Sequence, residues 1–288
     1  MSSFESLSRL DLSYPEDARR IRTRADVELY YEVRGEGTPI TLLNHFLMSA
    51  PLWRVFTEDL ARSYRLISYD LCNHGASSHV AEEPTWAEHV DDLVALLDAL
   101  EIESTYLIAA SASTVLARDM ALMHPDRVKG MVLAGPVYGP KGMRRQRQLQ
   151  RAWLRTIESH GIVGFYEHLY PELFSAEMNE ALGTPGFLGL REAFTAVTTL
   201  EDLVNGLNRS LVDDHKPEQA AGVQAPTLIV VGDDDLLLSP TGARELAEQF
   251  PNGSYEIMPR AGHQPFLDDA AGFQAIVRKF VDEVQSRA

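Results

Sequence analysis

Cysteine and long apolar runs are scarce in this sequence. The 288 residues include one cysteine, Cys72, which cannot form a disulfide within the chain. Residues 1–5 are polar and lack the basic stretch and apolar run of an export signal. A lone cysteine without an export signal is typical of the reducing cytoplasm, so we expect a cytoplasmic protein. No apolar stretch approaches the roughly 18 residues of a spanning helix, so we expect no membrane segment.

Positive charge is also in the minority. Lys and Arg number 26 against 42 Asp and Glu, which gives a formal net charge of −16. A surface this acidic repels nucleic-acid phosphates and anionic lipids, so we expect neither nucleic acid nor a membrane as a partner. The nine histidines show no His-Glu-x-x-His spacing, and no glycine-rich phosphate loop follows a strand. The sequence therefore predicts neither a metal site nor a bound cofactor.

The composition is otherwise that of a globular protein, with 45% hydrophobic and 24% charged residues. The length is about twice a domain of ~150 residues, which leaves two small domains or one large α/β domain with an insertion. Strand-like and helix-like patterns alternate in the first half, and this predicts a mostly parallel sheet with helices on both faces. The expected strands are an edge strand at 27–33 and buried strands at 40–43, 66–69, 106–109 and 128–133, and the expected helices are 51–63, 85–100 and 114–123.

The strand signal disappears between residues 137 and 222, where the sequence is helical and rich in aromatics. It returns with expected strands at 227–231 and 255–258 and helices at 241–250 and 272–284. The simplest interpretation is one α/β domain, made of residues 1–136 and 223–288, with a helical lid inserted at 137–222. Open parallel sheets bind ligands at the carboxyl ends of their strands, and we expect the lid to lie there.

Three residues that carry chemistry follow three of these strands. Ser111 lies on a short turn between an expected strand and a helix, where a serine is either an exposed nucleophile or a helix N-cap. Asp235 and His263 each lie just past a later strand. Because parallel strands end at the same edge, the three side chains are expected to meet there. A serine, an acid and a histidine in this order favour a nucleophile activated by an oriented imidazole.

The chain resembles the α/β-hydrolase family from about Arg20 to Val284. Five segments carry the resemblance: the serine turn 109–113, the acid loop 232–235, the histidine loop 261–266, the loop 70–77 and the link 124–128. The resemblance implies an α/β-hydrolase fold with a mostly parallel sheet. It also implies that Ser111 is the nucleophile, His263 the general base and Asp235 the acid that orients it. The same match places the oxyanion-hole donors at the backbone N–H groups of Phe46 and Ala112.

Two departures from the family pattern stand out. Ala109 and Ser113 occupy positions where the family usually carries glycine, and small residues keep most of the clearance. Asn44-His45 replaces a more usual histidine-glycine pair. The imidazole of His45 either donates to the substrate or hydrogen-bonds a neighbouring loop.

The first helix of the expected lid is amphipathic. Its arginines share one face and its apolar residues the other. The basic face either lies in solvent or docks an anionic group: a substrate carboxylate, coenzyme A or an acyl carrier protein. The aromatic residues of the lid favour an apolar substrate, with Trp153, Phe165 and Tyr166 as expected binding residues. The basic face consists of Arg144, Arg147, Arg151 and Arg155, and the apolar face of Leu149, Trp153 and Ile157.

These features predict a cytoplasmic serine hydrolase that cleaves an ester, lactone or acyl thioester of a largely apolar small molecule through an acyl-enzyme. The Asn44 segment resembles that of enol-lactone hydrolases, and the glycine-poor turn resembles that of enzymes that transfer hydroxyacyl chains. The same site could serve an acyltransferase or a carboxylate-eliminating lyase of secondary metabolism. A third hypothesis is a ligand receptor that has lost catalysis.

Overall fold

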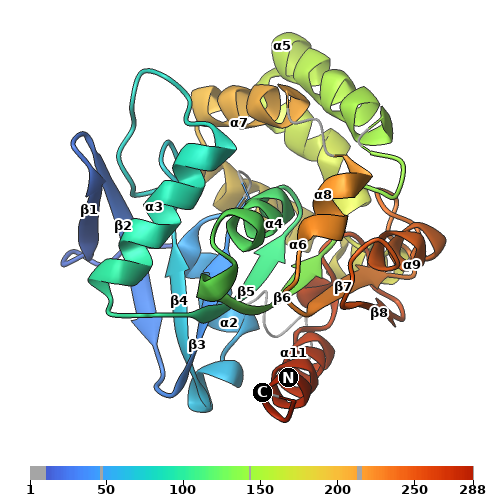
Figure 1. The fold of residues 1–288 in the computed structure, drawn as a ribbon. Helices are drawn as coiled ribbons and strands as arrows, with labels where there is room; N and C mark the ends of the chain where they lie inside the picture. The colour runs from blue at the N-terminus through green and yellow to red at the C-terminus, as the bar shows by residue number, and fades with distance from the viewer. Residues whose placement is uncertain (1–10, 46–47, 143, 213–215, 288) are drawn as a thin grey trace.

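The computed structural model describes residues 11–45, 48–142, 144–212 and 216–287. Its centre is an eight-stranded sheet with the order β1-β2-β4-β3-β5-β6-β7-β8 (Figure 1). Strand β2 is antiparallel to both of its neighbours, and every other pairing is parallel. The strands are β1 (Arg20–Arg24), β2 (Val27–Arg34), β3 (Thr38–Leu43), β4 (Tyr64–Tyr69), β5 (Thr105–Ala110), β6 (Val128–Ala134), β7 (Thr227–Gly232) and β8 (Gly253–Met258).

Every strand predicted from the apolar runs is present, and each extends the predicted range by one to two residues at one or both ends. The central strand β5 is buried along its whole length, as expected for a strand covered on both faces. Strand β1 was not predicted, because its sequence Arg-Ile-Arg-Thr-Arg has little apolar surface to bury. It pairs with β2 and makes β1, rather than the predicted 27–33 segment, the edge of the sheet.

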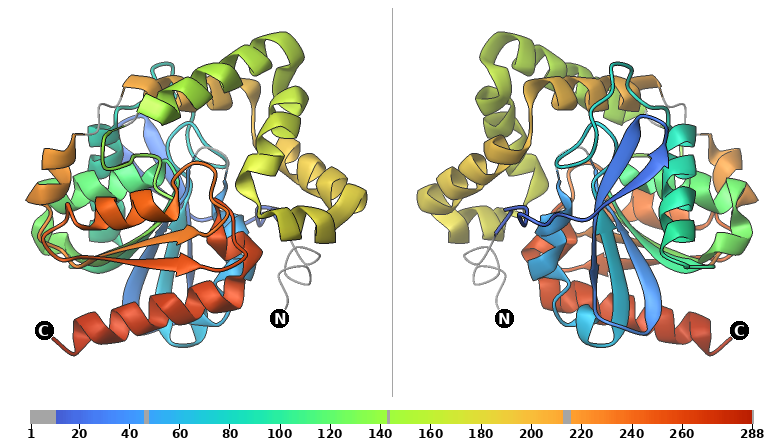
Figure 2. Two further views of the ribbon diagram at one scale, coloured as in Figure 1. Left: turned by 90° about the vertical axis from the view of Figure 1, so that its right-hand side faces the viewer. Right: turned by 90° about the vertical axis from the view of Figure 1, so that its left-hand side faces the viewer.

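Helices cover both faces of the sheet (Figures 1 and 2). One face carries α3 (Trp86–Ala99), α4 (Ser113–Met123) and α9 (Pro240–Ala247), and the other carries α2 (Trp53–Phe56) and α11 (Ala270–Gln285). Helix α3 begins with a capping box, in which the side chains of Thr85 and Glu88 satisfy each other's backbone N–H groups. No helix in the described part of the chain combines the length and apolar character that crossing a bilayer requires.

The helix predicted at about 51–63 is present only in part. This segment consists of η1 (Ala50–Leu52), α2 and η2 (Leu60–Arg62), with Thr57 at φ −129° between them. The hydroxyl of Thr57 bonds back to the carbonyl of Trp53 at 2.6 Å. The side chain of Gln274 on α11 then accepts from the N–H groups of Asp59 and Leu60 at 2.9 and 3.1 Å. Side chains therefore take over backbone groups that a continuous helix would use internally.

Four helices account for most of the described residues between β6 and β7. Helices α5 and α6 each bend at a glycine with positive φ, at Gly161 (67°) and Gly183 (53°). Figure 2 shows α5 and α6 reaching beyond one end of the sheet. The boundaries of a lid at 137 and 222, and its action as a cover, stay predictions. The helices are α5 (Arg144–Leu173), α6 (Ala176–Val197), α7 (Leu200–Val212) and α8 (Pro217–Gly222).

Candidate active site

Ser111 occupies a strained turn. It follows β5 directly, its φ is 51°, and its N–H continues the pairing with β6 by donating to the carbonyl of Ala134 at 2.9 Å. Helix α4 begins two residues later, with Ala112 as its N-cap. A positive φ is unfavourable for any residue other than glycine and persists only where the surrounding structure enforces it. Here the strand and the helix leave no other path, and the serine projects at the edge of the sheet.

The serine at position 113 explains one departure from the family pattern. Its side chain is fully buried, and its Oγ lies 2.7 Å from the carbonyl oxygen of Leu43 and 2.9 Å from that of Ala110. The same Oγ accepts from the N–H of Ala110 at 3.1 Å. The hydroxyl therefore links the serine turn to the end of β3, and a small polar residue fits where glycine is usual.

The imidazole of His263 is the partner of Ser111. Its Nε2 lies 3.0 Å from the Oγ of Ser111, and its side chain is fully buried. Gly135, at φ 56°, packs against this ring so closely that a Cβ there would lie 3.0 Å from two ring atoms and would collide with the carbonyl of His263. The backbone of Gly135 therefore limits the space on one side of the imidazole.

Asp235 completes the arrangement. Both of its carboxylate oxygens lie 3.2 Å from the Nδ1 of His263. The N–H groups of Leu237 and Leu238 donate to Oδ1 at 2.7 and 3.0 Å and fix the carboxylate. With an acceptor facing Nδ1, the ring carries its proton there, which leaves the Nε2 lone pair for the serine hydroxyl.

The other two aspartates of this loop do not face the ring. Asp233 is exposed. Asp234 accepts from the N–H of Ala176 at the start of α6, at 2.8 Å. The structure therefore brings Asp235, and neither of its neighbours, to the imidazole.

Of the two predicted oxyanion-hole donors, one can be located. Ala112 stands at the start of α4, where backbone N–H groups have no acceptor within the helix and the helix dipole favours negative charge. Phe46 lies outside the described residues. The amino terminus of α4 therefore supplies one N–H beside the serine.

The imidazole of His45 is buried and faces the histidine loop. The side-chain amide of Gln264 donates to its Nε2 at 3.3 Å. Burial lowers the pKa of His45 to about 3, and repulsion by His263 and His74 adds to this effect. The ring is therefore neutral at ordinary pH. This geometry favours the simpler of the two interpretations, in which His45 hydrogen-bonds a neighbouring loop.

A mostly apolar cavity of about 90 Å³ lies beside His45 and Gln264. Tyr166 is one of its lining residues. Trp153 and Phe165 are not among the lining residues that the structure describes. Trp153 donates its indole N–H to Glu172 at 3.0 Å and packs edge-on against Phe165. Of the three predicted substrate-binding aromatics, only Tyr166 is thus placed at the cavity. The described lining residues are Leu12, His45, Met48, Ser49, Leu52, Tyr166, Leu169, Leu173, Phe174, Leu190, Ala193, Phe194, Gln264 and Leu267.

The predicted basic face of α5 is partly engaged. Arg147 is half-buried and has a partner, while Arg151 and Arg155 are exposed. The side chain of Arg144 lies outside the described set. The exposed part of this face is therefore smaller than the sequence indicated.

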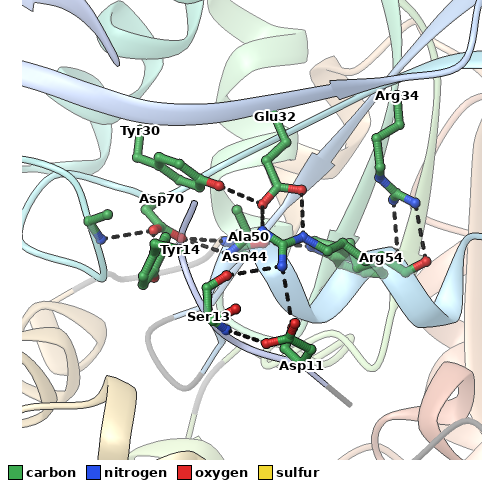
Figure 3. A network of polar contacts seen from close by, with 12 residues as sticks. Asp11, Ser13, Tyr14, Tyr30, Glu32, Arg34, Asn44, Ala50, Arg54 and Asp70 are labelled. Carbon is green, nitrogen blue, oxygen red and sulfur yellow. Dashed lines mark hydrogen bonds and ion pairs between the residues drawn. The ribbon is translucent and has the colours of Figure 1, made fainter. Parts of the chain in front are cut away.

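A buried carboxylate that the sequence analysis did not single out supports the loop after β3 (Figure 3). Asp70 accepts from the hydroxyl of Tyr14 at 2.8 Å and from the N–H groups of Ala50 and Ala76 at 2.7 and 3.0 Å. Asn44 reaches the same carboxylate with its amide at 3.3 Å. Burial raises the pKa of Asp70 to about 6. An aspartate directly after a buried strand was the available signal for this role.

A second buried carboxylate, Asp268, joins the histidine loop to the helical segment. Its Oδ2 accepts from the N–H of Gly262 at 3.0 Å. Its Oδ1 accepts from the N–H and the hydroxyl of Ser175, between α5 and α6, at 3.0 and 2.8 Å. The N–H of Gln264 also donates to the carbonyl of Leu173 at 3.2 Å. The loop that carries the base is therefore hydrogen-bonded to the wall of the cavity.

Within the described residues, no group of three His, Cys, Asp or Glu side chains is arranged so that it could hold a metal ion. The polar groups around Ser111 are those of acid–base chemistry.

Known proteins resemble this chain over most of its length. A pimeloyl-[acyl-carrier protein] methyl ester esterase of Nitrosospira multiformis is 26% identical and matches 88% of this chain and 98% of its own. MGS-M2, an alpha/beta hydrolase enzyme from a deep-sea metagenome library, has a TM-score of 0.81 at 23% identity, over 92% of this chain and 97% of its own. The enol-lactonase of Burkholderia xenovorans LB400 has a TM-score of 0.76 at 20% identity, over 92% of this chain and all of its own. A family model described as the alpha/beta hydrolase fold matches residues 38–270, and the chain therefore belongs to the α/β-hydrolase fold family.

Proposed function

We propose that the protein is a serine hydrolase that cleaves an ester, lactone or acyl thioester of a small, largely apolar molecule. One observation carries the proposal: the contacts from Ser111 to His263 and from His263 to Asp235, at 3.0 and 3.2 Å. A hydroxyl, an imidazole and a carboxylate in this order can activate the hydroxyl as a nucleophile. The hydrolases among its relatives support the same class of reaction.

The reaction follows from the positions of these atoms. The Oγ of Ser111 bonds to the substrate carbonyl carbon while its proton passes to the Nε2 of His263. Asp235, at Nδ1, stabilises the imidazolium that forms. The N–H of Ala112 donates to the carbonyl oxygen as that oxygen becomes negative. The imidazolium then gives its proton to the leaving oxygen or sulfur, and an acyl-enzyme remains.

The second half repeats these steps with water. His263 removes a proton from a water molecule whose oxygen bonds to the acyl carbon, and the imidazolium then returns the proton to Ser111 as the acid leaves. An alcohol in place of water would produce a new ester. Product analysis therefore separates hydrolysis from acyl transfer.

A fluorophosphonate probe tests the nucleophile. We expect it to label one residue, Ser111, and we expect His263→Ala to abolish labelling because the hydroxyl then keeps its proton. Peptide mapping by mass spectrometry locates the label. Labelling of another residue, or unchanged labelling of His263→Ala, would overturn the assignment.

A panel of esters, lactones and acyl thioesters tests the reaction type. We expect free acid to appear with wild type and to be absent with Ser111→Ala. Consumption of substrate without free acid, accelerated by an added alcohol, would instead support acyl transfer. Tight ligand binding by wild type and Ser111→Ala alike, without turnover, would support a receptor.

A further inference from the structure

Three buried polar atoms of residues that line the cavity lack a hydrogen-bond partner within the described part of the chain. They are the hydroxyls of Ser49 and of Tyr166 on α5, and the side-chain carbonyl oxygen of Gln264, next to the base. Ser49, Tyr166 and Gln264 are 3%, 4% and 1% exposed. Buried polar atoms are nearly always paired, so three such atoms lining one cavity indicate that a bound molecule pairs with some of them.

The types of these atoms restrict what can bind. The amide nitrogen of Gln264 is engaged with the ring of His45, which leaves the oxygen of the amide for the ligand, and a carbonyl oxygen can only accept. The hydroxyls of Ser49 and Tyr166 can donate or accept. A hydroxyl group on the ligand can do both, and it therefore matches Tyr166, Gln264 or the two together.

The remaining lining residues restrict the charge and size of the ligand. None of those that the structure describes is Asp, Glu, Lys or Arg. An ionised carboxylate would lose its water there without gaining a counter-charge, which is strongly unfavourable. The volume of about 90 Å³ is below the roughly 150 Å³ of a cavity that admits benzene, so the group must be short.

The cavity reaches the histidine loop. Gln264, one of its lining residues, directly follows His263 in sequence, and its amide contacts His45 at 3.3 Å. The position of Gln264, one residue beyond the base, makes the acyl group of the substrate the part to test in this cavity.

We infer that the cavity selects a short, uncharged acyl group that carries a hydroxyl, which pairs with Tyr166 and Gln264. This inference rests on the proposed function and narrows its substrate class. Short unsubstituted acyl groups should enter but leave both atoms unpaired. Acyl groups that end in a carboxylate should be rejected.

Three matched p-nitrophenyl esters test the inference: the butanoate, the 3-hydroxybutanoate and the succinate monoester. We expect wild type to favour the 3-hydroxybutanoate in kcat/KM and to hydrolyse the succinate slowest. Tyr166→Phe removes one oxygen atom from the cavity. It should lower the ratio of kcat/KM for 3-hydroxybutanoate over butanoate about three- to tenfold, as expected for the loss of one hydrogen bond. Gln264→Leu should lower the same ratio.

Tyr170→Phe is the matched control. The hydroxyl of Tyr170 is also buried and unpaired among the described residues, but Tyr170 is not one of the described residues that line the cavity. Its removal should leave the ratio unchanged. The ratio also cancels any general effect of Gln264→Leu on the neighbouring base.

The outcomes separate the inference from the proposed function. Hydrolysis of the butanoate through Ser111, with no preference for the hydroxylated ester or with equal effects of Tyr166→Phe and Tyr170→Phe, would overturn the inference alone. Preference for the succinate would do the same. Failure of wild type to hydrolyse any of the three esters, together with absent fluorophosphonate labelling, would overturn both.

Discussion

Gly135 determines how closely the chain can approach the imidazole of His263. It is at φ 56°, and a Cβ in its place would collide with the backbone of His263 and press on the ring. Both the backbone conformation and the lack of space therefore require glycine. A similar close approach occurs at Gly232, where a Cβ would collide with the backbone of Ala261.

We predict that Gly135→Ala lowers kcat at least about tenfold, because a shift of the ring by a fraction of an ångström lengthens the contact with Ser111. It should also destabilise the fold by about 1–2 kcal/mol through strain at positive φ. Ester turnover and urea unfolding measure the two effects. The control is Gly139→Ala, where the nearest atom is an ordinary 3.5 Å away. Equal kcat values for the two variants would contradict the prediction.

At the scale of single residues, the sequence predicted those positions that follow from the order of the strands along the chain. Ser111, Asp235 and His263 each follow a parallel strand, so their meeting at one edge was predictable. The site of Trp153 was not, because helical periodicity defines a face but not what that face packs against. Its indole instead points to Glu172 within the same kinked helix.

Helices α5 and α6 are attached to the histidine loop at their junction. Asp268 accepts from Gly262 on one side and from Ser175 on the other, and burial raises its pKa. Gly262 also lacks room for a Cβ, which would lie 2.6 Å from the backbone of Phe174. Movement of this junction would therefore displace the loop that holds the base.

We predict that Asp268→Asn lowers kcat between about ten- and a hundredfold, because the amide presents a donor where N–H groups already donate. The change keeps the shape of the side chain. The rate of fluorophosphonate labelling should fall in parallel, whereas a purely structural role would leave the folded enzyme fully reactive. Both rates are measured below the unfolding transition.

The neighbouring Asp269 provides the control. Its carboxylate accepts from the N–H of Gly272 and caps α11. Asp269→Ala should cost about 1 kcal/mol of stability and leave kcat unchanged. If both variants lose stability and neither loses activity, Asp268 does not position the base.

Element prediction succeeded where burial dominates and failed where single side chains decide. The continuous apolar runs of β3 to β7 predicted their strands directly. The break in the predicted helix at 51–63 depends on Gln274, more than 200 residues away in sequence. No local pattern encodes such a long-range contact.

Buried neutral histidines make the whole molecule sensitive to acid. Burial lowers the pKa values of His45 and His74 from 6.5 to about 3 in the folded protein. The unfolded chain binds protons at these rings below pH 6.5, whereas the folded chain does not until near pH 3. Acid therefore favours the unfolded state. Asp70 acts in the opposite direction between pH 6 and 3.8, because its folded pKa is raised and it binds a proton first in the folded state.

We predict that the free energy of unfolding falls as the pH drops from 6.5 to 5. His45 and His74 should each lower the free energy of unfolding by about 1.5 kcal/mol. Asp70 should offset about 1 kcal/mol of their combined effect. Urea unfolding at several pH values measures this slope. His74→Asn keeps a donor for the carbonyl of Cys72 and should reduce the slope by one histidine's share. A stability that is constant or rises over this range would contradict the prediction.

Tyr14 has a practical consequence for protein engineering. Its hydroxyl ends on Asp70, so the chain ahead of β1 is tied to the base of the loop that follows β3. An affinity tag fused directly before residue 11 would stand three residues from this hydrogen bond. A tag fused behind α11 would hang from a helix whose far end points away from α5 and α6 (Figure 2). Purification handles and immobilisation surfaces are therefore better attached at the latter position.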